Sequence, residues 1–211
     1  MELLTIRTGG ITWLEALDPA QTWYWGSDYT GGDLFEAEEL WRQGHRIRAN
    51  RLVLVRADGR LFEPLSAREG QYFGRPAMDG SSICLLLADF PAGLVRLLRF
   101  DPEGETLTPV VDIPLSEIED CYNLMHHTAP LCLTRQAKDR FQILWPEKAD
   151  FSIGPTESFF LRDGEELYFS RWHEDPDFRV ETVVRDMAGG IVTVLPGDVT
   201  ERPDGRNWLL V

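Results

Sequence analysis

Apolar residues occur along most of this chain in short runs of about four to eight residues, and Gly, Pro, Asp and Asn separate the runs. Runs of this length, bounded by turn-forming residues, predict β-strands rather than helices. The segment 115–124 fits either a short helix or an irregular connection. The predicted strands are Arg51–Arg56, Ile83–Leu87, Leu94–Phe100, Leu107–Ile113, Leu131–Thr134, Phe141–Trp145, Leu167–Trp172, Arg179–Arg185 and Ile191–Leu195.

One segment has the period of a helix instead. Its apolar residues recur at helical spacing and are Leu34, Ala37, Leu40 and Trp41. Asp33 stands at the position of an N-cap, and Gly44 follows as a residue that ends helices. The pattern therefore predicts one short helix over residues 33–43 in a chain that is otherwise mainly β.

The predicted strands repeat as a unit. Asp79-Gly80, Asp163-Gly164 and Asp204-Gly205 each lead into an apolar run, and their spacing fits a period of about 40 residues with one copy missing. Asp-Gly suits a tight hairpin turn because both residues tolerate positive φ. From Glu157 onward, four runs follow one another across short turns, and the same order begins at Tyr72. This order predicts four-stranded antiparallel meanders.

From about Arg51 onward, roughly three-quarters of the chain, the turns and the strand order resemble those of β-propeller repeat proteins. The chain as a whole is similar to small bacterial propeller-like proteins with no assigned function. No WD dipeptide, kelch double-glycine motif or other signature marks a named propeller subfamily. The resemblance implies a β-propeller-like fold of about 4–5 blades. A β-sandwich or a stack of hairpins is the alternative fold, because its strands and turn residues could be spaced similarly.

We expect the 211 residues to form a single domain. Residues 1–50 would form an irregular first blade that carries the helix, and residues 51–211 would form the repeated meanders. The last run, Trp208–Val211, is a lone strand that needs a sheet. We expect it to close on the first 20 residues, because closure leaves no sheet edge exposed.

Charge and cysteine content narrow the function classes. The 35 acidic and 21 basic residues give a net charge of −14, which disfavours binding to nucleic acid and to an anionic membrane surface. The first residues lack the pattern of a signal peptide, and no apolar run is long enough to span a membrane. The three cysteines lack CxxC spacing. We therefore expect a reduced, cytoplasmic protein.

The densest aromatic segment is Thr22–Asp33, which contains four aromatic residues, two carboxylates and three glycines. Trp23 and Trp25 are two residues apart, so on a strand they point to the same face and could stack against a carbohydrate or another ring. Asp28 and Tyr29 would add polar groups at the rim. The alternative is an aromatic strand packed in a core and followed by the loop that caps the helix.

Three further candidates, Arg75, His127 and Glu157, lie on predicted first strands of repeats. First strands line the axis of a propeller, so these side chains would converge there with the loop that follows Trp23. If Glu157 contacts a ligand, Glu157→Gln should abolish binding and leave the melting temperature unchanged. In the alternative interpretation, Arg75 is an ordinary ion-pair partner and His126–His127 is a structural pair, since neighbours on a strand point to opposite faces.

Motifs for catalysis are not recognisable in this sequence. It contains no GxSxG, HExxH or phosphate-loop pattern, so we predict no catalytic residue, no metal and no cofactor. We expect a binding or scaffold module for a protein partner or for a small-molecule or carbohydrate ligand. The alternative is a carbohydrate-active or other small-molecule hydrolase with an acidic and aromatic site at one mouth of the channel. A binding module should expose an apolar patch, whereas an enzyme should bring together carboxylates or histidines of perturbed pKa.

Overall fold

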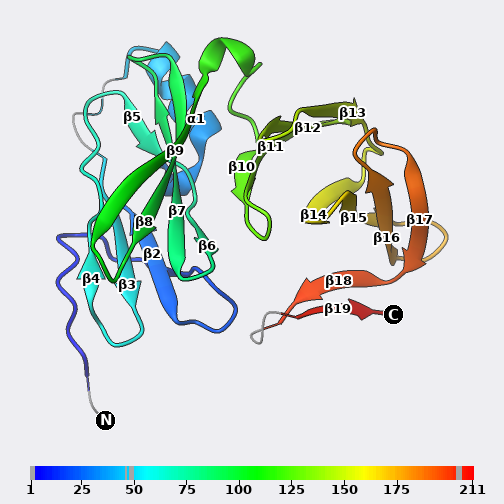
Figure 1. Cartoon of the computed structure of the whole chain (residues 1–211), viewed down its shortest axis with the longest axis horizontal. Helices are drawn as coiled ribbons and strands as arrows, with labels where there is room; N and C mark the ends of the chain where they lie inside the picture. Colours follow the sequence, from blue (N-terminus) through cyan, green and yellow to red (C-terminus); the bar gives the residue numbers. More distant parts are fainter. Residues whose placement is uncertain (1–2, 46, 48–49, 203–205) are drawn as a thin grey trace. The chain divides into compact units, whose positions relative to one another are not determined.

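A computed structural model describes residues 3–45, 47, 50–202 and 206–211 of the chain. The described residues are mainly β, with one α-helix and two 3-10 turns (Figure 1). Four antiparallel sheets each contain a meander whose strands follow chain order. The predicted mainly β class, with four-stranded antiparallel repeats of the kind found in propeller blades, is confirmed. The chain divides into two compact units, residues 1–121 and 122–211.

In the first sheet of residues 1–121, the chain forms a helix between the second and third strands. Its strands are β1 (Glu15–Ala16), β2 (Trp23–Ser27), β3 (Leu52–Arg56) and β4 (Leu61–Phe62). The helix α1 (Leu34–Arg42) confirms the predicted helix. The carboxylate of Asp33 accepts hydrogen bonds from the backbone N–H groups of Phe35 and Glu36, as expected of an N-cap.

The second sheet of this unit packs on the first through one apolar core. Its strands are β5 (Gln71–Phe73), β6 (Ala77–Asp79), β7 (Ser82–Asp89), β8 (Leu94–Asp101) and β9 (Thr106–Pro114). Strand β6 pairs with β7 next to β5. The core joins side chains of both sheets, among them Trp25, Leu54, Phe62, Phe73, Leu85 and Phe100. After β9, the segment whose structure the sequence leaves open begins with a 3-10 turn, Leu115–Glu117.

Residues 122–211 contain the other two meander sheets. The strands of one are β10 (Leu124–His127), β11 (Cys132–Ala137), β12 (Arg140–Trp145) and β13 (Ala149–Ser152). The strands of the other are β14 (Glu157–Asp163), β15 (Glu166–His173), β16 (Arg179–Asp186) and β17 (Ile191–Pro196). The two sheets bury a common core that includes Phe141, Ile143, Leu167, Phe169 and Val183.

Two of the three Asp-Gly pairs form the predicted turns. Asp79-Gly80 joins β6 to β7, and Asp163-Gly164 joins β14 to β15. Gly80 has φ +63° and Gly164 has φ +58°, which is the region where glycine avoids steric strain. The third pair, residues 204–205, lies outside the described residues.

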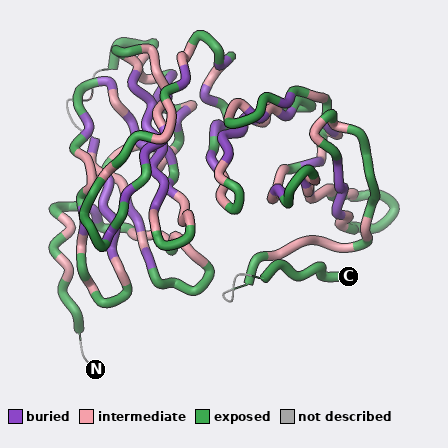
Figure 2. Tube along the Cα trace, viewed as in Figure 1, coloured by how far each residue is buried: buried purple, intermediate pink, exposed green. Residues whose placement is uncertain are grey.

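The C-terminal strand forms a ribbon with its neighbour in the chain. β18 (Asp198–Glu201) pairs with β19 (Asn207–Leu210) in a two-stranded sheet. All four residues of β19 are exposed, and Figure 2 colours the strand accordingly. The predicted closure of Trp208–Val211 on the first 20 residues stays a prediction. Among the described residues, the helices are all too short or too polar to cross a membrane.

Candidate functional site

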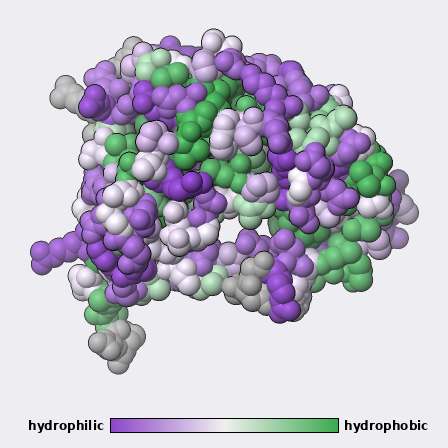
Figure 3. All heavy atoms as spheres, in the orientation of Figure 1, coloured by the Kyte–Doolittle hydropathy of each residue, from purple (hydrophilic) through white to green (hydrophobic). Residues whose placement is uncertain are grey.

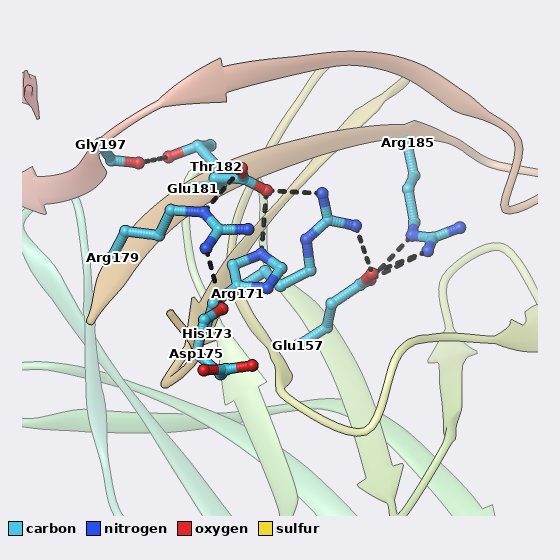
Figure 4. Close-up of polar contacts among 9 residues, drawn as sticks. All are labelled: Glu157, Arg171, His173, Asp175, Arg179, Glu181, Thr182, Arg185 and Gly197. Atoms are coloured by element: carbon cyan, nitrogen blue, oxygen red, sulfur yellow. Dashed lines mark hydrogen bonds and ion pairs between the residues drawn. The ribbon is translucent and has the colours of Figure 1, made fainter. Parts of the chain in front are cut away.

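A cluster of charged side chains lies on one face of the sheet β14–β17 (Figure 4). Its members are Glu157, Arg171, His173, Arg179, Glu181 and Arg185. Strand register explains the gathering, because Arg171 is the cross-strand partner of both Glu157 and Glu181. Directly opposite residues of antiparallel strands share one face. The cluster therefore lies on the same face as Phe169 and Val183 of the core.

Glu157 and Arg185 form the buried part of the cluster. Arg185 Nε donates to Glu157 Oε2 and Arg185 Nη2 donates to Oε1, each at 3.0 Å. Glu157 is 3% exposed and Arg185 is 8% exposed. Arg185 Nη1 also donates to the carbonyl oxygen of Gly189 at 2.7 Å. Both carboxylate oxygens of Glu157 are thus occupied by one guanidinium, and the pair ties β14 to β16.

Glu181 organises the outer part of the cluster. Its Oε2 accepts a hydrogen bond from Arg171 Nη2 at 2.7 Å and lies 3.0 Å from His173 Nε2. Arg179 Nε lies 3.6 Å from the other oxygen. The hydrogen bond from Arg171, and then the one from His173, lower the pKa of Glu181. Arg171 Nη1 is also 3.7 Å from Glu157 Oε1, so one arginine links the two carboxylates.

His127 lies in the same unit as Glu157, and Phe159 and Gln136 connect them. The His127 ring packs edge-on against Phe159 with ring centroids 4.7 Å apart, and its Nε2 is 3.1 Å from the hydroxyl oxygen of Thr134. Gln136 donates to the carbonyl oxygen of Glu157 and accepts from the backbone N–H of Phe159. Two predicted site residues on the first strands β10 and β14 are therefore placed in one packed region.

Desolvation lowers the pKa of His127 to about 4. Between pH 6.5 and 4 the unfolded chain then binds a proton that the folded chain does not, so the free energy of unfolding falls as the pH falls through this range. We expect His127→Gln to remove that part of the pH dependence, at most about 1.4 kcal/mol per pH unit. Urea denaturation between pH 8 and 4 measures it. A stability difference from wild type that is constant over this range would contradict the assignment.

The aromatic candidates of residues 1–121 are buried. Trp23 packs against Phe62 with ring centroids 5.5 Å apart, and Trp25 is 3% exposed. The guanidinium carbon of Arg75 lies 5.9 Å from the centre of the Trp25 ring, and Arg75 forms an ion pair with Glu15 at 3.1 Å. Arg75 lies between β5 and β6 rather than on the predicted first strand, and the structure brings it to Trp25. The burial of both tryptophans agrees with the core interpretation rather than with a stacking platform.

The two polar candidates of the loop after β2 make local contacts. Asp28 Oδ1 accepts from the backbone N–H of Arg51 at 2.8 Å, and the N–H of Asp28 donates to the carbonyl oxygen of Arg51. Tyr29 packs near Tyr72 with ring centroids 6.4 Å apart. These contacts hold the loop to β3 and β5. Asp28 and Tyr29 belong to residues 1–121, whereas His127 and Glu157 belong to residues 122–211.

The thiols are not poised as nucleophiles. All three cysteines are buried and free of disulfides. Burial raises the pKa of Cys84 and of Cys132 to about 11, and burial likewise raises the pKa of Cys121. Within the described part of the chain, no group of three or more His, Cys, Asp or Glu side chains could hold a metal ion.

Sequence reasoning missed most members of the charged cluster. A signal was nevertheless present, because charge replaces apolar character on one face of two strands. On β15 the alternate residues after Phe169 are Arg171 and His173, and on β16 those before Val183 are Glu181 and Arg179. An apolar strand face that turns charged at one end, on two adjacent strands, indicates a cross-strand ion cluster.

Comparisons with known proteins show no family. Neither a family model nor a curated protein matches the sequence. Among solved structures, a crystal structure described as a "putative 6-phosphogluconolactonase" from Bacteroides uniformis is similar, with 14% sequence identity and a TM-score of 0.35. The match covers 87% of this chain and 59% of the other protein, so the chain spans about three-fifths of that protein's length. No function follows from this likeness.

Proposed function

We propose that this protein is a binding module and that it holds a protein partner on the last strands of residues 122–211. The observation that carries the proposal is the exposure of apolar side chains there. On β17, Ile191 and Val192 are each 53% exposed and Val194 is 40% exposed. On β19, Trp208 is 44% exposed and Leu210 is 54% exposed. Apolar side chains exposed together in this way are typical of interaction sites.

The surface view supports the same assignment. In Figure 3, hydrophobic residues gather on the part of the surface that β17 occupies. One residue, Gly197, separates the end of β17 from the start of β18, and Thr182 Oγ1 donates to its carbonyl oxygen at 2.9 Å. The ribbon β18–β19 is therefore anchored directly beside the end of β17, and the apolar strands form one stretch of the chain.

The charged cluster supports binding more than hydrolysis. Glycoside hydrolysis needs two carboxylates that face the substrate. Both oxygens of Glu157 accept from Arg185, and Glu181 is held by Arg171. The pKa of His127 is lowered to about 4, so its imidazole is neutral at pH 7. It is therefore not in the imidazolium form that acts as a general acid.

Site-specific photo-cross-linking tests the proposal. Thr193, an exposed residue of β17, is replaced by p-benzoyl-phenylalanine in the full-length protein, and expressing cells are irradiated. We expect one discrete protein adduct. Ser152, exposed on the last strand of the other sheet of the same unit, is the matched control position and should give none. No adduct at Thr193, or equal adducts at both positions, would contradict the proposed function.

A further inference from the structure

β17 is an open sheet edge. It is the last strand in the order β14-β15-β16-β17, and within the described residues it pairs with β16 alone. An edge strand leaves half of its backbone N–H and C=O groups without a strand partner, and these groups can pair with another chain. Side chains of this strand are exposed as well, namely those of Ile191, Val192 and Val194. Both the backbone and the side chains of β17 are thus available.

The last strands of the other three meander sheets carry features that discourage such pairing. β4 is only two residues long, and β13 is four residues long and contains Asp150 in an ion pair with Arg140. β9 contains Pro109 near its middle and Asp112. Short length, proline and charge are the usual ways in which proteins protect sheet edges.

β17 lacks these features. It is six residues long, contains no charged residue, and has its one proline at the last position, Pro196. A bulge at Val192 interrupts its pairing with β16, since Val184 pairs with Thr193 and Arg185 pairs with Ile191. A corresponding bulge occurs in β9, between β9 and β8, so the bulge does not distinguish the two edges. The absence of charge over six residues distinguishes β17 from β4, β9 and β13, and β19, which is also uncharged, is only four residues long.

We propose that β17 pairs antiparallel with β17 of a second copy of this chain, forming a two-fold symmetric dimer with one continuous sheet. The inference rests on the proposed function and names its partner. A two-fold interface requires a surface that complements itself. Pairing centred on Thr193 sets Val192 opposite Val194 and Ile191 opposite Leu195, so that apolar side chains meet across the two strands.

The lack of charge on β17 favours pairing with a second copy of β17 over a partner held by ion pairs. The chain carries a net charge of −14, so two copies repel each other at long range. Because β17 is uncharged, pairing its six residues with those of a second β17 sets neutral residues against neutral residues. The dimer should therefore tighten as salt screens the repulsion between copies, whereas a complex with a basic partner would weaken.

Sedimentation velocity of the full-length protein over a range of concentrations and salt tests the inference. We expect a dimer whose dissociation constant falls with added salt. Val194→Lys should raise that constant by about tenfold or more, because it places a desolvated charge in the shared sheet. Phe178→Lys is the matched control, since Phe178 is 72% exposed in the turn between β15 and β16, and it should leave the constant unchanged.

A second variant keeps the test independent of the effect of lysine on folding. In Thr193→Cys, the two new thiols would face each other across the two-fold axis and form an intermolecular disulfide on mild oxidation, whereas Ser152→Cys would not. The three native cysteines are buried and should stay reduced. A wild-type monomer at all concentrations, a dimer unaffected by Val194→Lys, or no disulfide in Thr193→Cys would overturn the inference. A cross-link from Thr193 to a different protein would then still support the proposed function.

Discussion

Replacing Glu157 with leucine is expected to lower the free energy of unfolding by about 3–5 kcal/mol. The variant leaves the guanidinium of Arg185 in place but removes the carboxylate that accepts two of its hydrogen bonds. Arg185 is 8% exposed, so water cannot replace the lost partner without opening the structure. The penalty is the cost of an unpaired buried charge rather than the net contribution of the ion pair.

Urea denaturation followed by far-UV circular dichroism measures this change. The double variant Glu157→Leu/Arg185→Leu should recover much of the loss, because it removes both charges. Glu181→Gln is the matched control on the same face, and it should cost less than about 1 kcal/mol because Glu181 is partly exposed. A single Glu157→Leu variant as stable as wild type would show that the pair is not formed. The ligand hypothesis for Glu157 expects the reverse, lost binding with unchanged stability.

Replacing Trp25 with alanine is expected to lower the free energy of unfolding by about 3–5 kcal/mol. Trp25 is 3% exposed, and it packs in the core of residues 1–121. Its indole ring also supports the loop that leads to α1, since a Cβ placed on Gly32 would lie 3.0 Å from the ring. Alanine would leave a cavity beneath both the loop and the core.

The matched control is Trp13→Ala in the same unit. Trp13 is 73% exposed, so its removal should change the free energy of unfolding by less than about 0.5 kcal/mol. Both variants are compared with wild type by urea denaturation, with circular dichroism as the signal because it does not depend on the removed indole. Equal, small effects for the two tryptophans would contradict the burial of Trp25 and restore it as a surface for stacking.

Local pattern was sufficient to predict the helix and most of the long strands, but not short strands such as β4 and β13. Short apolar runs and turn residues predicted the strands, and the meander predicted from Glu157 onward corresponds to β14–β17. Asp33 and the apolar spacing after it predicted α1, which the structure gives as Leu34–Arg42. These features depend on residues that are near one another in the chain, so their physical causes, capping, turn geometry and side-chain period, are readable from the sequence.

The candidate site was only partly predictable. The sequence identified Glu157 and His127 as residues of first strands. It did not identify Arg185 as the ion-pair partner of Glu157, because Arg185 is 28 residues away and pairs with it across β15. With 35 acidic and 21 basic residues, the sequence allows very many ion pairs. Only the packing of three strands, and the reach of the Arg185 side chain across Phe169, selects this one.

The sequence by itself therefore determined where the helix and most of the long strands form, because helical period, apolar runs and turn chemistry act over a few residues. The tertiary structure alone decided what each face meets. It buried Trp23 and Trp25 in a core, paired Glu157 with Arg185, and left β17 as an open sheet edge. Periodicity assigns a residue to a face, but burial, ion pairing and exposure depend on the elements that pack against that face.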